Sequence, residues 1–450
     1  MCIFATQMSF ADFILQHEAD DPVALLLARE RYPDIDLDLA VTTLEVRRRL
    51  KMKVPEWYAV PSLVYPSRLS GEQCSSSETA RYKASLIARS IGEVVPPETC
   101  GHPRPQKREG PAACGGRGRS AAEAVSGGIP SPITIADLTG GMGVDTWAFS
   151  QVAGEVLYNE MQEGLARTTE LNFRELGVKN VVYRNCVVEA GKVAEVLDGF
   201  RPDVIFLDPA RRAEDGRKVF LIEKCQPDVL GLLPELFAAS RFVLLKLSPM
   251  ADITMACKRL GEHVKEVHVV ASGGECKELL FLLDREWSGG YSLTAYENGH
   301  TLSWTPEEEA SAPPVFPESP ALSGVLFEPG KALLKAGAFN LPCERFGLTK
   351  LGQHTHLYVG ESVPDGLRPF GKVFDVLEIM PLGNRNIKEA GKRWPQAEVT
   401  ARNVPMTSDL LRRKLGCASG GDIHLFGIRI DASSGSGNYL VVTKKRYGTD

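Results

Sequence analysis

The sequence lacks several features that would place it in a familiar class of protein. No apolar run reaches the roughly 18 to 20 residues that span a bilayer, so we expect no membrane segment. The first residues, MCIFATQMSFADFILQHEADD, have no basic segment and turn acidic early, and we expect no signal peptide. None of the ten cysteines forms a CxxC pair or a Cys/His cluster. In a chain of 450 residues this favours reduced thiols in the cytoplasm and argues against disulfides, structural zinc or another metal site.

The chain also lacks the strong positive charge of a protein that binds nucleic acid along its whole length. The net charge is −5. Residues 321–450 nevertheless carry 18 Lys plus Arg against 12 Asp plus Glu, a net +6, which leaves −11 on the first 320 residues. A basic C-terminal module behind an acidic body is compatible with RNA binding, although ordinary variation in charge explains it equally well.

The pattern along the chain divides it into regions. Apolar residues recur at helical spacing in residues 1–92, which predicts an N-terminal helical region. Residues 93–132 are rich in Pro, Gly, Ser and Arg and are predicted to form a disordered loop or linker. An Arg-Gly-rich stretch can touch RNA, but a solvated insertion also fits. The run TPEEEASAPPVFPESP (305–320) marks a second linker or long loop.

Strands and helices alternate between residues 133 and 287. Apolar strand patterns such as ITIADL, EVLYNE, VIFLDP and RFVLLKLS alternate with helical ones. Repeated strand–helix units predict an α/β fold with a parallel sheet covered by helices on both faces. EVHVVASGGECKELLFLLDRE adds a final antiparallel pair, which completes a Rossmann-like sheet of seven strands. Beyond the second linker, VFDVLEIM, AEVTARNVP, DIHLFGIRI and YLVVTK predict strands and SDLLRRKLG a helix, an α+β region.

The most informative motif is the run from Asp137 to Asp145, DLTGGMGVD, at the end of the first parallel strand. Ligands of open parallel sheets bind beyond the carboxyl ends of the strands. Gly140, Gly141 and Gly143 let the backbone turn sharply and approach a ligand closely. Asp137 can accept a hydrogen bond from a cationic amino group or a bridging water. The turn is led by an acid and is not the GxGxxG of dinucleotide-binding enzymes.

Two polar side chains follow the next strands. Glu160 ends the second strand, where a ribose diol would lie, and Asn185 follows the third, in reach of an adenine edge. Dinucleotide enzymes also place an acid at the first position, and Asn is a common turn residue, so each alone leaves the alternative open. Together with the glycine turn they favour a nucleoside site.

The fourth strand ends in a run that resembles the (D/N)PP(Y/F/W) motif of amino-group N-methyltransferases. Here it reads Asp208, Pro209, Ala210, Arg211. In that motif the acid or amide and a following carbonyl accept hydrogen bonds from a substrate NH₂ and aim its lone pair, which is catalysis by orientation. Ala210 replaces the second proline and Arg211 the aromatic residue, so Arg211 would stack on a base or clamp a phosphate. The alternative role for Asp208 is that of a helix cap or turn residue.

A third segment, EQCSSSETARYK (72–83), precedes the sheet. Ser77, with Thr79 close behind, is predicted to cap the helix that follows. From such a helix N-terminus, Ser76, Thr79 and Lys83 could cover a cofactor carboxylate, but an ordinary capped helix is the preferred interpretation.

The motifs in their order, EQCSSSETARYKA, DLTGGMGVDT, NEMQ, RNC, FLDPARR and KLSP, resemble one bacterial group. It is the class I S-adenosyl-L-methionine-dependent methyltransferases with a C-terminal THUMP-like domain, distantly similar to trimethylguanosine synthase and bacterial 16S rRNA guanine-N2 methyltransferases. The runs FEPGKALLKAGAF, THLYVG, ARNVPMTSDLLRRKLG and GGDIHLFGIRI resemble the THUMP-like module. The resemblance implies a methyltransferase domain at 133–287, a small ferredoxin-like segment with the Pro/Glu-rich linker at 288–323, and a THUMP-like domain at 324–450.

The resemblance also implies roles for residues. Catalytic positions are Asp208 and Pro209, to which we add Arg211. The candidate cofactor contacts, in which Thr139, Asp145 and Met161 join the motif positions as neighbours, are Asp137, Thr139, Gly140, Gly141, Gly143, Asp145, Glu160, Met161 and Asn185. Candidate phosphate contacts in the THUMP-like part are Lys331, Lys335, Arg402, Arg412, Arg413 and Lys414, although each could equally be a solvated surface charge.

The sequence therefore predicts a cytoplasmic enzyme that transfers a methyl group from S-adenosylmethionine to a nucleobase nitrogen of structured RNA. Three alternatives stay open. An NAD-dependent oxidoreductase would need the GxGxxG turn that is missing here. A noncatalytic RNA-binding protein with a methyltransferase fold would explain the altered DPAR motif. A methyltransferase that acts on protein or a small molecule is opposed only by the basic C-terminal region.

Overall fold

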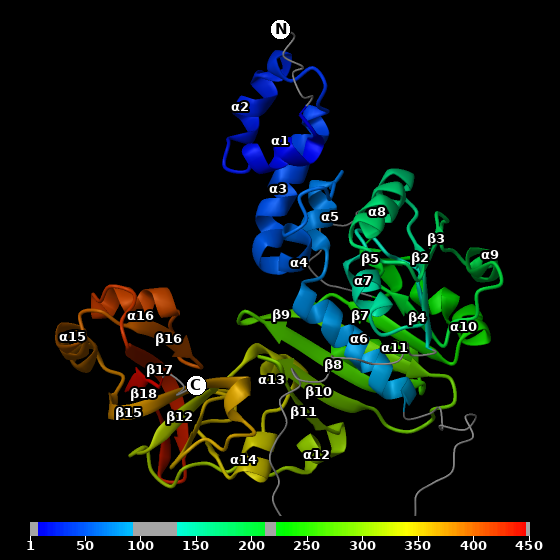
Figure 1. The fold of residues 1–450 in the computed structure, drawn as a ribbon. Helices are drawn as coiled ribbons and strands as arrows, with labels where there is room; N and C mark the ends of the chain where they lie inside the picture. Colours follow the sequence, from blue (N-terminus) through cyan, green and yellow to red (C-terminus); the bar gives the residue numbers. More distant parts are fainter. Residues whose placement is uncertain (1–7, 93–132, 212–221, 447–450) are drawn as a thin grey trace, which may run out of the picture. The chain divides into compact units, whose positions relative to one another are not determined.

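The computed structural model describes residues 8–92, 133–211 and 222–446 (Figure 1). The predicted loop at 93–132 therefore lies outside the described residues. The described chain divides into two compact units. The first holds the residues up to 265 together with 280–289, and the second holds 266–279 and the residues from 290 onward.

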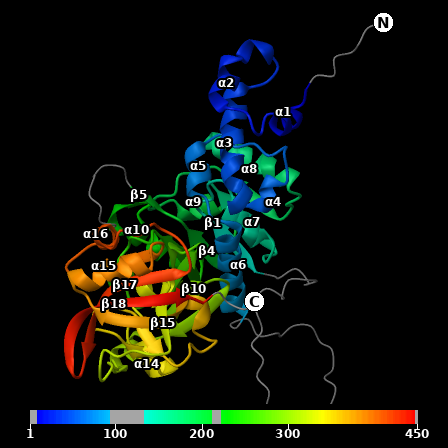
Figure 2. The same cartoon turned by 90° about the vertical axis from the view of Figure 1, so that its left-hand side faces the viewer.

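The N-terminal region is helical, as the apolar spacing predicts. Its helices are α1 (Phe10–Gln16), α2 (Pro22–Leu27), α3 (Leu37–Lys53), α4 (Pro55–Tyr58), α5 (Arg68–Gln73) and α6 (Ser77–Gly92). Ser9, Asp21 and Asp36 cap the first three α-helices, because their side chains accept hydrogen bonds from otherwise unpaired backbone N–H groups. A small apolar core that includes Phe13, Leu25 and Leu44 joins α1 and α2 to α3. Figure 2 shows these three helices grouped together.

The central sheet has the strand order β11-β10-β8-β9-β7-β4-β1-β2-β3. The strands are β1 (Thr134–Asp137), β2 (Glu155–Asn159), β3 (Val181–Arg184), β4 (Val204–Leu207), β7 (Phe242–Leu247), β8 (Val264–Ser272), β9 (Glu275–Asp284), β10 (Ser292–Glu297) and β11 (His300–Trp304). Strands β3, β2, β1, β4 and β7 pair in parallel, so their carboxyl ends share one edge. Each residue of β4, VIFL, is buried, as expected for a parallel strand covered on both faces.

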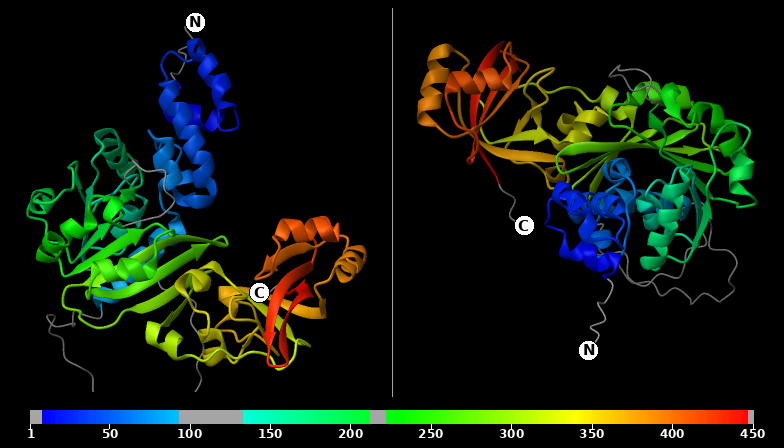
Figure 3. Two further views of the ribbon diagram at one scale, coloured as in Figure 1. Left: turned by 180° about the vertical axis from the view of Figure 1, so that it is seen from behind. Right: turned by 90° about the horizontal axis from the view of Figure 1, so that it is seen from above.

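The crossover helices are α7 (Val144–Ser150), α8 (Glu163–Glu175), α9 (Val193–Leu197), α10 (Val229–Ala239) and α11 (Ile253–Leu260). Helices α7 and α8 lie on one face of the sheet and α10 and α11 on the other (Figure 3). A short ladder of β5 (Ala210–Arg211) with β6 (Cys225–Gln226) follows β4. The predicted α/β fold is confirmed, and the seven expected strands form the contiguous set from β3 to β8.

Two strands extend the sheet beyond the seven predicted. Strands β10 and β11 form an antiparallel hairpin, and β10 pairs in parallel with β8. The hairpin turns at Asn298 and Gly299, both with positive φ, which is the Asn-Gly signal of a tight turn. The linker predicted at 305–320 also contains structure: α12 (Pro306–Ser311) begins with a capping box between Thr305 and Glu308. In residues 305–320 this local cap signal outweighs the Pro- and Glu-rich composition.

A second sheet forms most of the C-terminal part, in the order β13-β14-β12-β15-β18-β17-β16. Its strands are β12 (Val325–Pro329), β13 (Thr349–Lys350), β14 (Tyr358–Gly360), β15 (Gly371–Pro381), β16 (Glu398–Arg402), β17 (Ile423–Ala432) and β18 (Gly435–Lys445). Its helices are α13 (Lys331–Ala336), α14 (Leu341–Phe346), α15 (Asn384–Arg393) and α16 (Ser408–Leu415). The four strands and the helix predicted beyond the second linker are β15 to β18 and α16.

Alternation along the strands gives this sheet two apolar faces. Leu425 packs with residues of α15 and α16 on one face, and its neighbour Phe426 packs on the other. Leu440 and Val441 of β18 divide in the same way. Both faces are therefore covered. No helix among the residues described is long and apolar enough to cross a membrane.

Candidate functional site

The site lies at the shared carboxyl edge of the parallel strands, where the loops after β1, β2 and β4 meet. Asp137 ends β1, and the glycine loop follows it. The loop is held close to β2: Gly140 N donates to Asn159 O at 2.7 Å, and the Tyr158 hydroxyl donates to Gly141 O at 2.6 Å. These bonds fix the loop against the neighbouring strand.

The glycines are needed for different reasons. A Cβ on Gly140 would overlap the Tyr158 ring. Gly143 has φ +87° and a Cβ there would lie 2.7 Å from Thr169 Cγ2 and 2.8 Å from Phe173 Cζ. Gly141 has φ +54° but open space around it. The backbone therefore passes closer to its neighbours than any residue with a side chain permits.

Asp137 is fully buried beneath this loop. Thr146 Oγ1 donates to its Oδ2 at 2.6 Å, and Thr139 N donates to its Oδ1 at 3.1 Å. Burial raises the pKa of Asp137 to about 7, while the Thr146 hydrogen bond acts in the opposite direction. The negative charges of Asp145 and Asp208 add to the rise.

Glu160 is buried at the end of β2, with both carboxylate oxygens on backbone N–H groups. Gly141 N donates to Oε2 at 3.0 Å and Gln162 N to Oε1 at 2.8 Å. Each carboxylate oxygen can accept a further hydrogen bond, for example from a ribose hydroxyl. Met161, the next residue, is 55% exposed at this edge. Asn185 is exposed, and its amide donates to Glu160 O at 2.6 Å, so it braces the turn after β2.

One residue that sequence reasoning missed joins three strand ends. Asn159 is buried, and its amide donates to Leu138 O at 3.0 Å and to Cys186 O at 3.1 Å. Its side-chain oxygen accepts from Cys186 N at 2.9 Å. The sequence signal that could have identified Asn159 is an amide side chain within an apolar strand, because a buried amide requires several hydrogen-bond partners.

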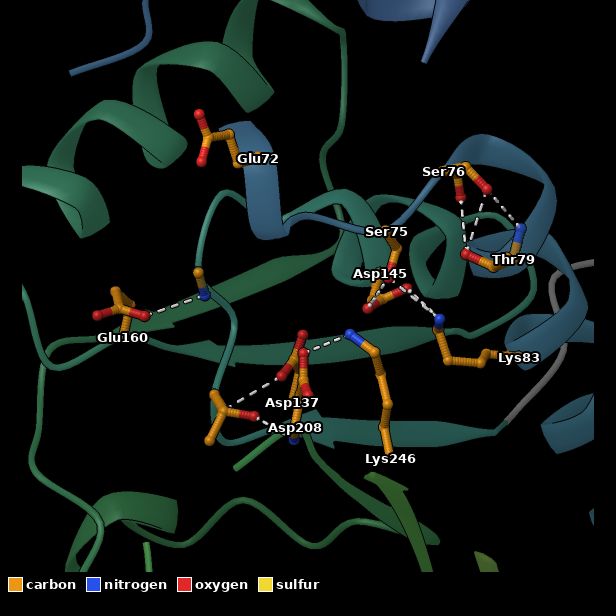
Figure 4. A network of polar contacts seen from close by, with 12 residues as sticks. Glu72, Ser75, Ser76, Thr79, Lys83, Asp137, Asp145, Glu160, Asp208 and Lys246 are labelled. Carbon is orange, nitrogen blue, oxygen red and sulfur yellow. Dashed lines mark hydrogen bonds and ion pairs between the residues drawn. The ribbon is translucent and has the colours of Figure 1, made fainter. Parts of the chain in front are cut away.

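Asp208 follows β4 and is held from both neighbouring strands. Its backbone N donates to Thr139 Oγ1 at 2.7 Å, from the loop after β1. Lys246 of β7, a second residue that sequence reasoning missed, donates from Nζ to Asp208 Oδ2 at 2.5 Å (Figure 4). The predicted cap or turn alternative for Asp208 is not needed to explain these contacts. Pro209 is buried beside it, and Arg211 lies in β5.

The segment before the sheet supplies a buried polar cluster. Lys83 of α6 is fully buried, with Nζ 3.1 Å from Asp145 Oδ1 and 3.1 Å from Ser75 Oγ. Ser75 Oγ donates to Asp145 Oδ2 at 2.8 Å. Lys83 therefore faces Asp145 and not open solvent.

Helix α6 is capped one residue earlier than predicted. It begins at Ser77, and the Ser76 hydroxyl accepts from Thr79 N at 3.2 Å, so Ser76 is the cap. The Ser77 hydroxyl donates to Glu56 Oε2 at 2.5 Å. Ser76 and Thr79 thus act as in an ordinary capped helix.

The donor and acceptor set fits a nucleoside cofactor. Gly140 and Gly143 let the loop pass close to its packed neighbours, and the loop backbone then lies beside Glu160, whose Oε2 accepts from Gly141 N. In the described part of the chain, no group of three or more His, Cys, Asp or Glu side chains could hold a metal ion.

The C-terminal cations differ in their surroundings. Arg402 pairs with Glu328, and Arg412 Nη2 lies 3.4 Å from Glu398 Oε2. Arg413 and Lys414 are exposed in the last turn of α16, Lys331 is exposed at the start of α13, and Lys335 is half-buried. The exposed cations are the ones best placed to meet a phosphate.

Comparison with known proteins gives the site a context. Residues 326–366 match a family model described as a ferredoxin-like domain, and residues 371–445 match one described as THUMP domain-like. Over 99% of its length the chain is similar to the whole of a crystal structure from Porphyromonas gingivalis W83, with 28% sequence identity and a TM-score of 0.77. That protein is described, provisionally, as a methyltransferase. The chain has a methyltransferase fold with a THUMP-like C-terminal domain.

Two further solved structures are similar over part of the chain. A methyltransferase homolog from Pyrococcus horikoshii is 21% identical, over 31% of this chain and 48% of its own, with a TM-score of 0.25. An rRNA methylase from Streptococcus thermophilus is 14% identical, over 34% of this chain and 87% of its own, also at 0.25. No curated protein matches the chain. The predicted resemblance is confirmed by the full-length match and the THUMP-like domain. The ferredoxin-like match begins after the 288–323 segment expected from the sequence.

Proposed function

We propose that this protein is an S-adenosylmethionine-dependent methyltransferase that methylates a nucleobase nitrogen of structured RNA in the cytoplasm. The observation that carries the proposal is the meeting of the Asp137 glycine loop with Asp208 at one sheet edge, through the 2.7 Å bond from Asp208 N to Thr139 Oγ1. The full-length similarity to the protein described as a methyltransferase supports the reaction class. The described cysteines form no disulfide with one another, which supports the compartment.

In this proposal, one group of site residues binds the cofactor and another binds the methyl acceptor. Asp137, the glycine loop with Asp145, Glu160, Met161 and Asn185 would hold S-adenosylmethionine. When bound, the cofactor would supply a methyl group to the lone pair of the acceptor nitrogen, with the electron pair of the broken C–S bond kept by sulfur and the proton of the nitrogen released to water. Asp208 and the Pro209 carbonyl would orient the amine, and Arg211 would contact the base or a phosphate.

The proposal also specifies RNA as the molecule that is methylated. The THUMP domain-like match at 371–445 and the exposed cations Arg413 and Lys414 support it. A noncatalytic RNA-binding protein is the second candidate, because Ala210 and Arg211 depart from the usual amine-methylating motif. A non-RNA methyl acceptor is the third. Both are outcomes of the experiment below.

The first experiment is calorimetric titration with S-adenosylmethionine, with NAD as the competing cofactor. It is run at about pH 8, where Asp137, whose pKa is about 7, is ionised. We expect micromolar binding of S-adenosylmethionine and none of NAD. Asp137→Ala should abolish binding, and Glu163→Ala, which removes an exposed carboxylate of α8, should leave it unchanged.

Labelled methyl transfer to RNA and to protein from cells that lack the enzyme then separates the candidates. Label in RNA supports the full proposal, whereas label only in protein or small molecules assigns another acceptor. Binding of RNA without binding of S-adenosylmethionine or its demethylated product would contradict the proposed enzyme activity and favour the noncatalytic RNA-binding protein.

A further inference from the structure

A lysine stands directly beside the proposed amine-binding carboxylate. Strands β4 and β7 pair in parallel with Leu207 opposite Leu245, so the next residues along, Asp208 and Lys246, are neighbours at the sheet edge. Lys246 Nζ lies 2.5 Å from Asp208 Oδ2. The Lys246 side chain is 12% exposed and that of Asp208 is 37% exposed, so the lysine lies deeper and the carboxylate faces the site.

The two contacts of Asp208 fix it from opposite sides. Thr139, in the loop after β1, accepts from its backbone N–H. Lys246 of β7 donates to Oδ2 (Figure 4). Among the described contacts, Oδ1 is left to face a ligand. A carboxylate restrained at its backbone and at one oxygen presents the other in a fixed direction, which is what orientation of an amine requires.

We propose that Lys246 is a positioning residue that aims Asp208 and balances its charge at the methyl-transfer centre. This inference rests on the proposed function. A lone carboxylate next to the positive sulfonium of S-adenosylmethionine would tighten cofactor binding without helping transfer. The ammonium of Lys246 offsets that attraction and leaves Asp208 to accept a hydrogen bond from the acceptor.

The pairing of Asp208 with Lys246 also favours one kind of methyl acceptor. With Lys246 on Oδ2, Asp208 has its other oxygen to accept a hydrogen bond from a neutral NH₂. Lys246 would in addition repel a cationic acceptor. The neighbourhood therefore suits the exocyclic amine of a nucleobase better than the side chain of a protein lysine.

The test compares two ligands that differ by one charge. S-adenosylmethionine carries the positive sulfonium, and S-adenosylhomocysteine is neutral at sulfur. Calorimetry gives the ratio of the two affinities for each variant. We expect Lys246→Met to raise the preference for S-adenosylmethionine roughly tenfold, because the Asp208 charge is then unbalanced. Asp208→Asn should lower it by a similar factor, and Lys246→Arg should keep the wild-type ratio.

Two variants complete the design. Removing both charges with Lys246→Met and Asp208→Asn should return the ratio toward wild type. Lys258→Met, which removes an exposed cation of α11, is the control for loss of charge elsewhere. An unchanged ratio in both single variants overturns the inference and leaves Lys246 a structural partner, even if one of them folds poorly. Failure of the wild type to bind either ligand overturns the proposed function itself, and this inference with it.

Discussion

Gly141 and Gly143, two residues apart, allow the free-energy cost of an unfavourable backbone conformation to be distinguished from that of a steric clash. Gly141 and Gly143 both have positive φ, +54° and +87°. Only Gly143 also lies against side chains, those of Thr169 and Phe173 of α8. An added methyl group therefore meets open space at one position and a packed helix at the other. Comparing substitutions at the two positions therefore measures how much stability depends on the close packing of the glycine loop against α8.

We expect Gly141→Ala to cost about 1 kcal/mol of unfolding free energy, because alanine disfavours the left-handed conformation. Gly143→Ala should cost about 3 kcal/mol or more, since the added Cβ also displaces Thr169 or Phe173. Denaturant unfolding measures both, and S-adenosylmethionine titration should show the larger loss of affinity for Gly143→Ala. Equal destabilisation by the two variants would mean that α8 gives way and the close approach is unimportant.

At the residue scale, sequence reasoning identified two acids at the ends of parallel strands and missed the side chains that brace them. Asp137 and Asp208 stand out because an acid at the end of an apolar parallel strand needs an explanation. Lys246 lies within the apolar run FVLLKL, and its partner is distant in sequence, so only the pairing of β4 with β7 brings it to Asp208. Asn159 is hidden in the same way, because its partners come from the turns after β1 and β3.

At the scale of elements, the N-terminal helix α6 is joined to the sheet by buried charge. Helices α6 and α7 meet at Lys83, Ser75 and Asp145, and Asp145 is only two residues after Gly143. Burying an ammonium and a carboxylate costs desolvation free energy that their attraction offsets only when both are present. The N-terminal helical region is thereby coupled to the start of α7 and to the glycine loop.

Lys83→Met should therefore destabilise the protein by about 3 to 5 kcal/mol, because it leaves the Asp145 carboxylate buried without its cation. Arg81→Met is the matched control on the same helix: its ion pair with Glu56 is 54% exposed at the arginine and should contribute less than about 1 kcal/mol. Thermal or denaturant unfolding compares them. Similar losses for the two variants would contradict a special role for the buried pair.

Sequence patterns predicted the elements that have a regular apolar spacing and missed those that depend on a short local signal. The parallel strands and α3 have apolar runs whose spacing predicts the structure that is observed. Strands β10 and β11 were not predicted, because residues 288–323 were assigned by resemblance to a small ferredoxin-like segment with a linker and the turn signal between the strands spans only two residues. Helix α12 was missed because the composition of residues 305–320 indicated a linker, whereas the Thr305 cap is local and Pro306 stands at the first helical position, where proline is tolerated.

At the scale of the whole molecule, chemistry and docking are assigned to different units. The site residues from Ser75 to Lys246 all belong to the first unit, and the exposed cations of α16 belong to the second. Residues 321–450, which lie within the second unit, carry the net +6, and the first 320 residues carry −11. An acidic catalytic part gains little from phosphate attraction, so the proposal places RNA affinity in the C-terminal sheet domain.

Binding to RNA should then depend on salt through the second unit. Replacing Arg413 and Lys414 by Gln should weaken binding to a labelled RNA hairpin and lower the slope of log affinity against log salt by about two, because each cation would neutralise one phosphate. Lys179→Gln with Lys258→Gln, which removes two exposed cations from the first unit, should leave the slope unchanged. Fluorescence anisotropy at several salt concentrations measures it. If the control pair lowers the slope and the α16 pair does not, RNA docks on the catalytic unit, and the cations of α16 are solvated surface charges.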